Sequence, residues 1–595
     1  MGNWQLVPGK IITRWAKDVT PENTWPEYPR PQMRRTDWQN LNGLWKYAIV
    51  DKNQEMVRSF ENEILVPYPI ESALSGVKRI LQPDERLWYR RSFTIPKDWF
   101  GKNILLHFQA VDWEATVWVN GNEVGMHQGG YLPFWFDITS YLVDGQNELV
   151  VAVWDPTDAH WQQHGKQVRK PNSIWYSAVS GIWQTVWLEP VPEAFIAGLK
   201  VTPDLDTGSL HIKVDVHYSS TTKSVLLGGI IKVHESGVSI AEASLNSTEE
   251  EMEIPIPHPK LWSPDTPHLY DLTVVIGEDR VESYFGLRKF SIGKDPQGQM
   301  RLCLNNQPLF QYGPLDQGYW PDGLYTPPSD EAMRWELETL KSLGFNMLRK
   351  HVKVEPARYY YYCDKLGLIV WQDMINGGAS VGKFTSFLAN LFGSRRRDHN
   401  YRYAGRYLED SRQDYFKELK ILVDHLYNFT CIGMWMPFNE GWGQFDANVI
   451  AEWLKKYDPS RLVDHASGWF DQGGGDCQSL HVYFKRIPII KPEKNRSTVL
   501  SEFGGYSLKI GGHLWNPKAE FGYKKFNSKE ALTDAYLELI ESKLKPFIEA
   551  GLSAAVYTQT SDVEIEVNGF LTYDREIEKM EFRRLYKAHQ GLWED

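Results

Sequence analysis

The sequence contains few cysteines and no long apolar run. Its 595 residues include four cysteines, Cys303, Cys363, Cys431 and Cys477, with no C-x-x-C pair. This scarcity excludes a disulfide framework and a zinc knuckle, and it is compatible with a reducing compartment. No stretch reaches the roughly 18 consecutive apolar residues that a membrane-spanning helix needs. We therefore expect no membrane partner.

Positive charge is also in short supply. Lys and Arg total 65 against 76 Asp and Glu, a formal net charge of −11, which disfavours a protein that binds nucleic acid by neutralising phosphates. The one basic run, Arg395 to Arg397, is too short to change that expectation. The segment Met1 to Thr13 lacks the charged-then-apolar pattern of a signal peptide. We expect a cytoplasmic protein, or a secreted or periplasmic one if a leader has been removed.

Aromatic residues, by contrast, are plentiful, with 25 Trp and 30 Tyr. Sugar rings stack on flat aromatic faces, although large β-rich proteins also use these residues in strands. The 42% hydrophobic and 24% charged residues are those of an ordinary globular protein and exclude wholesale disorder. At roughly 150 residues per domain, the length predicts about four domains, or fewer if one is a large barrel.

The first half of the chain has the period-two alternation of β-strands. Between residues 41 and 188 alternating segments are broken by turn residues, and Asn120-Gly121 suits a two-residue hairpin turn with positive φ at both positions. We predict a jelly-roll domain over residues 1–190. A second block of short strands, from about Pro192 to Ile292, suits an immunoglobulin-like β-sandwich over residues 191–292.

After residue 292 helices and strands alternate. Ser329 precedes an acidic turn, an apolar stripe at helical spacing and Gly344, which predicts a helix with both ends marked. Eight strand candidates are recognisable: 309–312, 345–349, 368–372, 431–437, 461–465, 479–482, 498–501 and 554–558. Eight βα units in about 300 residues predict a (β/α)₈ TIM barrel over residues 293–595.

Two carboxylates stand at strand ends, where the active site of such a barrel lies. Glu440 and Glu502 each end an apolar strand and precede a glycine. Glycosidic cleavage needs such a pair, one to protonate the leaving oxygen and one to face the anomeric carbon. A single Glu at a strand end is more often solvated or salt-bridged, but Asn439 beside Glu440 and the neighbouring Trp435 and Trp442 favour a catalytic pair.

The chain resembles glycoside hydrolase family 2, which contains β-galactosidases, β-glucuronidases and β-mannosidases. Four segments are similar to the family's sugar-binding-like jelly roll: 111–121, 127–131, 136–139 and 181–188. Two more, 261–264 and 267–270, are similar to its immunoglobulin-like domain. The motifs around the two glutamates, WMPFNEGWG at 435–443 and VLSEFGG at 499–505, match as well. The resemblance implies a retaining double displacement, with Glu440 as acid/base and Glu502 as nucleophile, about 5 to 5.5 Å apart.

The resemblance also implies roles for neighbouring residues. Asn439 would bind the sugar 2-hydroxyl, Tyr483 would orient the nucleophile, and Arg349 would keep it ionised. The remaining substrate-binding candidates are His351, Asp373, His481, Trp442, Trp515 and Gln559. A structural role is equally open for the histidines, including His465, and for Asp373, and Trp320 is a further stacking candidate. A loop of the jelly roll with Asp155 and Asp158 is expected to reach the barrel.

Departures from the family pattern narrow the substrate. The glucuronidase branch has an Asn-x-Lys motif near the eighth strand, where this chain has Asn568-Gly569-Phe570, so a uronic acid is disfavoured. The large β-galactosidases have two further domains and metal ligands, whereas this chain ends soon after its eighth strand. We expect no metal or other cofactor, and an oligosaccharide or glycoside substrate.

The predicted activity is exo-hydrolysis of terminal β-linked neutral sugars, with β-galactose the first candidate. Mannose, a pentose or a furanose stays open, as does a non-catalytic carbohydrate-binding protein of the same architecture. The oligomeric state, including a homo-oligomer, is open too.

Two rival motifs overlap between residues 377 and 384. Gly378 to Gly382 matches the serine-esterase motif G-x-S-x-G, but the preceding strand ends several residues too early for a nucleophile elbow. Gly377 to Lys383 approaches a phosphate-binding loop, but Phe384 replaces the required hydroxyl residue. We expect this segment to be a lid or a subsite wall.

Overall fold

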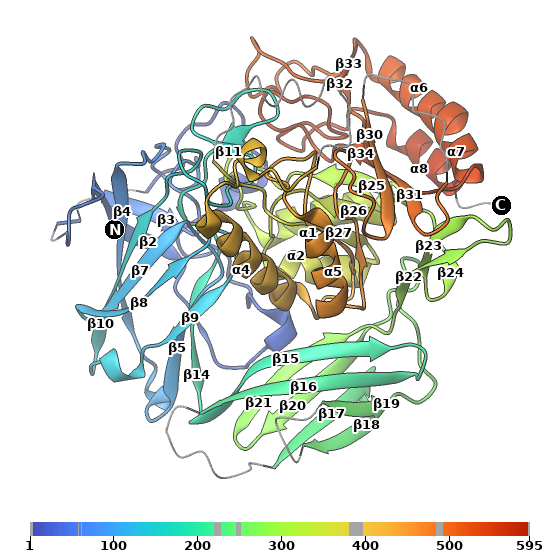
Figure 1. Ribbon diagram of the computed structural model, residues 1–595. Coiled ribbons are helices and arrows are strands. Elements are labelled where there is room, and N and C mark those ends of the chain that lie inside the picture. Colours follow the sequence, from blue (N-terminus) through green and yellow to red (C-terminus); the bar gives the residue numbers. More distant parts are fainter. Residues whose placement is uncertain are drawn as a thin grey trace.

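The computed structural model describes residues 4–57, 59–60, 62–218, 228–245, 251–379, 397–483 and 492–592. The rival motifs from Ser380 onward, and Arg395 and Arg396 of the basic run, lie outside these residues. Figure 1 shows three groups of strands: blue at the start of the chain, teal to green in the middle, and yellow to red towards the end. The predicted order of two β domains and one barrel is confirmed.

The first domain packs a six-stranded antiparallel sheet against a four-stranded one. The sheets have the orders β3-β2-β4-β10-β7-β8 and β1-β14-β5-β9. Their strands are β1 (Gln39–Asn40), β2 (Gly43–Asp51), β3 (Asn62–Val66), β4 (Glu85–Thr94), β5 (Asn103–Phe108), β7 (Glu114–Val119), β8 (Asn122–Gln128), β9 (Phe134–Asp137), β10 (Gln146–Trp154) and β14 (Val186–Val191). Asn120 and Gly121, both with positive φ, form the predicted turn between β7 and β8.

The second domain is a smaller sandwich of two antiparallel sheets, β15-β16-β19 and β18-β17-β20-β21. Its strands are β15 (Ala194–Asp204), β16 (Ser209–Tyr218), β17 (Gly229–Glu235), β18 (Val238–Leu245), β19 (Met252–Pro255), β20 (Tyr270–Ile276) and β21 (Asp279–Phe285). Alternate residues of both sheets, among them Ile212, Val233 and Val274, are buried between them, as expected for an immunoglobulin-like core.

The barrel consists of eight parallel strands in the order β29-β28-β27-β26-β25-β34-β31-β30. They are β25 (Gln311–Asp316), β26 (Met347–Lys350), β27 (Ile369–Asp373), β28 (Ile432–Met436), β29 (Leu462–Val463), β30 (Cys477–Val482), β31 (Ser497–Gly504) and β34 (Leu552–Thr558). All eight overlap their predicted ranges. Strands β29 and β30 are not paired along their length, but the Asp476 amide donates to the Val463 carbonyl at 2.7 Å where they meet.

Helices follow most of the strands, on the outside of the barrel. They are α1 (Asp330–Ser342), α2 (Ala357–Leu366), α4 (Glu409–Leu426), α5 (Ala447–Tyr457), α6 (Lys529–Leu539), α7 (Lys545–Glu549) and α8 (Phe582–Gln590). Ser329 caps α1 through the Ala332 amide, as predicted. The expectation of a helix in every unit is wrong after β29, because residues 464–476 form a glycine-containing loop. Within the described part of the chain, no helix is both long and apolar enough to cross a membrane.

A segment of the first domain reaches the barrel, but through other residues than expected. The Asp155 carboxylate stays inside the first domain, where it accepts from the Ser180 hydroxyl at 2.6 Å, and Asp158 pairs with Arg169. The contact is made by the following residues, which include β11 (Gln167–Val168) and β12 (Tyr176–Ser177). The Ser177 carbonyl accepts from the hydroxyl of Tyr319, which follows β25, at 3.3 Å. Gln163 bridges to Gly377, so this segment lies against the loop that follows β27.

Candidate active site

Glu440 is presented by a strained turn after β28. Its φ of +50° lies in the left-handed region, which is unfavourable for a side chain larger than glycine. The turn is held because the Glu440 amide donates to the Ser467 carbonyl at 2.9 Å. Gly441 also has positive φ, and a Cβ there would come within 1.9 Å of the Phe470 ring. The Glu440 side chain remains 19% exposed, so the turn aims a carboxyl group at the open end of the barrel.

Glu502 lies within β31 and is 4% exposed. One carboxylate oxygen accepts from the Arg349 guanidinium at 3.0 Å, and the other accepts from the Tyr483 hydroxyl. Burial alone would raise the pKa of Glu502, but His481 and Arg349 together lower it to about 2. Glu502 is therefore ionised at neutral pH.

The two carboxyl groups are close together. One oxygen of Glu440, one of Glu502 and a ring nitrogen of His481 all lie within 4.8 Å of one another. His481 lies between them, with Nδ1 3.0 Å from Glu440 and Nε2 2.9 Å from the Ser467 hydroxyl. Retaining glycosidases have carboxyl groups about 5 to 5.5 Å apart and inverting ones about 6.5 Å or more. The geometry is of the retaining kind.

Arg349 joins the residues that surround Glu502. It is fully buried at the end of β26 and donates to both oxygens of Asp373 at 2.9 and 3.0 Å and to Asn439 Oδ1 at 2.8 Å, besides Glu502. Because Arg349 occupies Asn439 Oδ1, the Asn439 Nδ2 group, which has no partner among the described residues, is the part of this amide that can meet a ligand.

His351 and Asp373 support Arg349 from behind. His351 Nδ1 lies 2.7 Å from the Asp373 carboxylate. Burial raises the pKa of Asp373 while Arg349 lowers it, and burial holds the pKa of His351 well below its usual value. The Asp373 oxygens are occupied by Arg349, His351 and the Val352 amide. These predicted site residues are near the pair, but Asp373 positions Arg349 and does not face the open end.

Tyr483 is held on both sides. Its hydroxyl donates to Glu502 and lies 3.0 Å from the Thr558 hydroxyl. Its ring stacks on that of Tyr523, with the ring centroids 3.8 Å apart. Sequence reasoning missed Tyr523 and Ser467, because each lies in a loop without a periodic pattern and reaches the site only through the fold.

Several other predicted residues are placed away from the carboxyl pair. Trp320 is 3% exposed, between Trp15 and the Arg575 guanidinium, so its expected role as a stacking platform is wrong. Trp435 is buried within the barrel wall and donates to Asp458 at 2.9 Å. His465 is buried against Asp471.

The last three candidates are distributed around the barrel mouth. Trp442 packs edge-to-face with Trp175 of the first domain, with the ring centroids 4.6 Å apart. The Trp515 ring packs against Tyr573, and the Lys10 ammonium group lies over it. Neither contact involves the carboxyl pair. Gln559 is fully buried, and its amide donates to Asn568 at 2.8 Å.

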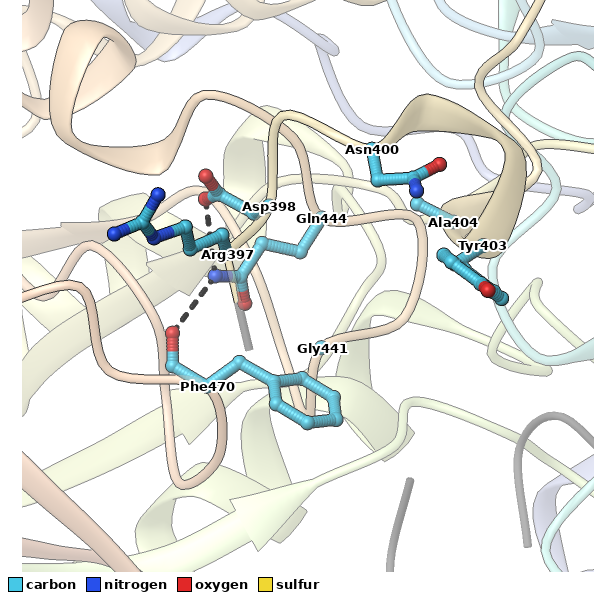
Figure 2. A pocket seen from close by; sticks show the side chains of 8 residues that line it. All are labelled: Arg397, Asp398, Asn400, Tyr403, Ala404, Gly441, Gln444 and Phe470. Carbon is cyan, nitrogen blue, oxygen red and sulfur yellow. Dashed lines mark hydrogen bonds between the residues drawn. The ribbon is translucent and has the colours of Figure 1, made fainter. Parts of the chain in front are cut away.

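A pocket lies next to the turn that carries Glu440 (Figure 2). It is lined by Arg397, Asp398, Asn400, Tyr403, Ala404, Gly441, Gln444 and Phe470. Gln444 holds two of its walls together, because its amide donates to Asp398 at 3.2 Å and to the Phe470 carbonyl at 3.0 Å. Gly441 follows Glu440 directly, so the pocket adjoins the turn that presents this carboxyl group.

Glu440, His481 and Glu502 are the described residues whose donor atoms come close enough to share a cation. The Arg349 guanidinium, bonded to Glu502, already brings a positive charge to that position. Glu502 therefore carries a negative charge beside a second carboxyl group, and such a pair can carry out acid/base chemistry with its own side chains.

Comparison with known proteins gives three family matches that together cover most of the chain. The family descriptions "Glycosyl hydrolases family 2, sugar binding domain", "Glycosyl hydrolases family 2" and "Glycosyl hydrolases family 2, TIM barrel domain" match residues 58–192, 194–288 and 328–582. A β-galactosidase of Vibrio cholerae is 24% identical over 81% of this chain and 50% of its own length. A putative β-glucuronidase of Formosa agariphila is 26% identical over 83% and 60%. The chain thus spans about half the length of the curated relatives it matches.

Solved structures share the fold. A β-glucuronidase of Ruminococcus gnavus has a TM-score of 0.74 at 17% identity, over 96% of this chain and all of that one. A family 2 β-galacturonidase of Eisenbergiella tayi bound to galacturonate has a TM-score of 0.70 at 20% identity, over 95% and 99%. With three successive domains matched in the same order, the chain belongs to glycoside hydrolase family 2.

Proposed function

We propose that the protein is an exo-acting glycosidase that hydrolyses a terminal β-linked sugar with retention of configuration. The observation that carries the proposal is the pair of carboxyl groups, Glu440 and Glu502, within 4.8 Å of each other in different surroundings. Glu502 is buried and bonded to a guanidinium, and Glu440 is partly exposed beside a pocket. Such a difference separates a nucleophile from an acid/base group.

The first step is the attack of Glu502 on the anomeric carbon. As the C1–O bond breaks, Glu440 gives its proton to the leaving oxygen, and a covalent glycosyl–enzyme ester forms. His481, 3.0 Å from Glu440, fixes the direction of that carboxyl group. In the second step Glu440 takes a proton from water, the water oxygen attacks C1, and Glu502 leaves as a carboxylate. Two inversions at C1 give net retention.

Three neighbours assist the transition state. Arg349 and Tyr483 hold the two oxygens of Glu502, so that the nucleophile is both oriented and ionised. Asn439 Nδ2 is positioned to donate to the sugar 2-hydroxyl, a bond that strengthens as the oxocarbenium-like transition state forms.

These groups act at C1 and C2, which all β-hexosides share. The neutral sugar expected from the sequence, with β-galactose first, rests on the absence of Asn-x-Lys at residue 568. In the structure, Asn568 is tied to Gln559 and Glu566 in a buried hydrogen-bond network. The relatives' names include both β-galactosidase and β-glucuronidase, so the choice of sugar depends on the remaining charges of the site.

The experiment is hydrolysis of a panel of aryl glycosides, α- and β-linked, pyranose and furanose, neutral and uronic. Wild type is compared with Glu502→Ala, with Glu440→Ala, and with Glu576→Ala as a control at an exposed carboxylate. We expect one β-glycoside to be turned over, by wild type and the control alone. Azide added to Glu502→Ala should restore turnover and give the α-glycosyl azide, and added to Glu440→Ala the β-glycosyl azide. Activity that survives Glu502→Ala refutes the mechanism.

The alternative is a carbohydrate-binding protein without turnover. It would bind a sugar from the panel and hydrolyse none of them, and azide would produce nothing in either variant. The intact arrangement of Glu440, Glu502, Arg349 and Tyr483 supports the enzyme, because a binding protein has no use for an ionised carboxylate directed at C1.

A further inference from the structure

Lys166 brings a positive charge from the first domain to the open end of the barrel. The residue is nine-tenths buried, yet its ammonium group forms no ion pair and no hydrogen bond with the described residues. Nζ lies over the Tyr176 ring, 5.6 Å from its centroid. The side chain is therefore packed into the protein while the ammonium group reaches solvent, so the charge is available to an anion that comes with the ligand.

The backbone around Lys166 is fixed against the barrel. The amides of His164 and Gly165 both donate to the Asn376 carbonyl, at 3.1 and 3.0 Å. Gly165 has a φ of +59°, and a Cβ at this position would come within 2.8 Å of the Val352 carbonyl. Only glycine allows this approach, which brings Lys166 next to the residues that follow β26.

Three groups on different strands locate the charge of Lys166. Burial raises the pKa of Glu566, after β34, and Lys166 has the next largest influence and lowers it. Burial and then Lys166 lower the pKa of His351, after β26. Lys166 also lowers the pKa of Glu502 on β31. Its effect there is smaller than those of burial, His481, Arg349 and His351. The contacts agree, because the Tyr176 ring next to Nζ carries the hydroxyl that donates to Glu566, and Gly165 lies against Val352, the neighbour of His351. The ammonium group therefore lies on the side of the barrel where β26 and β34 end.

Glu566 is one candidate for a protein counter-ion, and both of its oxygens already accept hydrogen bonds. One accepts from the Asn568 amide at 2.9 Å, and the other accepts from the Tyr176 hydroxyl. Glu566 forms no ion pair with Lys166. The carboxylate that Lys166 lacks is not supplied by the described part of the chain.

We propose that Lys166 binds a carboxylate on the sugar ring, so that the substrate is a terminal β-linked uronic acid. The inference rests on the proposed glycosidase function, and it replaces the expectation of a neutral sugar. The reason for that expectation was the missing lysine near residue 570. Lys166 fills the same need from another domain. A sugar hydroxyl could also accept from Lys166, but an anion gains charge–charge attraction that strengthens in a buried site.

The test compares sugars that differ only at C6, aryl β-galacturonide with β-galactoside and aryl β-glucuronide with β-glucoside. The variants are Lys166→Gln and, as a control that removes the same charge from an exposed site in the same segment, Lys170→Gln. We expect wild type to prefer the uronide of one pair. Lys166→Gln should lower kcat/KM for that uronide by about 10- to 100-fold, the range for losing a hydrogen bond to a charged group. The neutral partner should change less than about threefold, and Lys170→Gln should behave as wild type.

The neutral sugar separates recognition from a general effect of charge on Glu502. If Lys166 acted only by keeping Glu502 ionised, its loss would reduce turnover of both sugars equally. An equal loss, or a wild type that prefers the neutral sugar, overturns the proposal. Which of the two uronides is turned over names the sugar.

Binding gives a readout that does not need turnover. Free galacturonate, glucuronate, galactose and glucose are titrated into wild type and Lys166→Gln by calorimetry, with thermal unfolding as the check on folding. Tighter binding of a uronate than of its neutral counterpart, lost in Lys166→Gln, supports the inference even if no glycoside is hydrolysed and the proposed function fails. Equal binding of both sugars overturns it. Lys166→Arg, which keeps the charge, should retain the preference, and Lys166→Met, which keeps the length of the side chain without its charge, replaces Lys166→Gln should that variant fail to fold.

Discussion

Replacing Tyr483 by Phe removes one of the two hydrogen bonds that hold the nucleophile. The hydroxyl donates to Glu502, while the ring stacks on Tyr523 and would keep that contact as phenylalanine. Arg349 still holds the other oxygen of Glu502. The perturbation therefore acts on the carboxylate and leaves the packing of the loop in place.

The size of the effect follows from the charge on Glu502. A hydrogen bond to a charged group contributes about 1.5 to 3 kcal/mol, which corresponds to about one to two pKa units at 1.36 kcal/mol per unit. The bond stabilises the ionised carboxylate, so its removal raises the pKa. Starting from a pKa of about 2, Tyr483→Phe should bring Glu502 to about 3 to 4. The acid limb of activity then moves to higher pH, because the protonated form cannot attack.

The assay is the pH profile of kcat/KM between about pH 3 and pH 8 on the best aryl glycoside. We expect wild type to show no acid limb from Glu502 above pH 3, and Tyr483→Phe to lose activity as the pH falls through 4. At pH 7 the variant should be about 10- to 100-fold slower, since a poorly oriented carboxylate attacks less often. Unchanged activity with an unchanged acid limb would show that Tyr483 does not position Glu502.

Three further predictions test other parts of the molecule. Glu440→Gln should slow hydrolysis of substrates with poor leaving groups by about 10²- to 10⁴-fold. The rate of the first step on a dinitrophenyl glycoside, measured as a burst, should fall far less. Equal losses of rate on both substrates would exclude Glu440 as the acid. Asn439→Ala should lower kcat/KM on the normal glycoside as much as removing the 2-hydroxyl from the substrate lowers it for wild type. The variant acting on the 2-deoxy glycoside should then show no further loss. Additive losses would show that Asn439 does not bind the 2-hydroxyl. Burial raises the pKa of Glu71 to about 8. Its neutral form therefore stabilises the first domain fully below about pH 4.5, and this contribution is lost as the pH rises through about 8. Glu71→Gln should reduce the decline of the unfolding temperature between about pH 5 and 8.5, and an identical decline in both proteins would refute this prediction.

The architecture was predictable because its signals are local. A strand that alternates, or a run such as Ser329 to Gly344 with a cap at each end, is recognisable from a few neighbouring residues. The eight barrel strands were therefore found, although β25 and β31 extend beyond the C-terminal ends of their predicted ranges. Strand ends also marked Glu440, Glu502, Arg349 and Asn439, because a parallel barrel brings the carboxyl ends of its strands together.

Residues that come from loops could not be found in this way. Ser467 and Tyr523 follow no periodic pattern, and both touch the site only after the barrel closes. Trp320 shows the opposite error, since a tryptophan in the barrel domain is as readily buried in the protein as exposed to a sugar. An aromatic residue alone does not reveal which of its faces is free.

Lys166 is the strongest case of a signal that no local pattern could give. It belongs to the first domain, far from the eighth strand where a lysine was sought, and Gly165 and Asn376 place it at the barrel mouth. A motif search asks whether a residue type stands at a given position in the chain, whereas a substrate meets only the position of a charge in space. The absence of Lys near residue 570 therefore did not establish the absence of a cation from the site. If the uronide is the substrate, the selectivity of the barrel is set by a loop of another domain, and the catalytic pair is the same for either sugar.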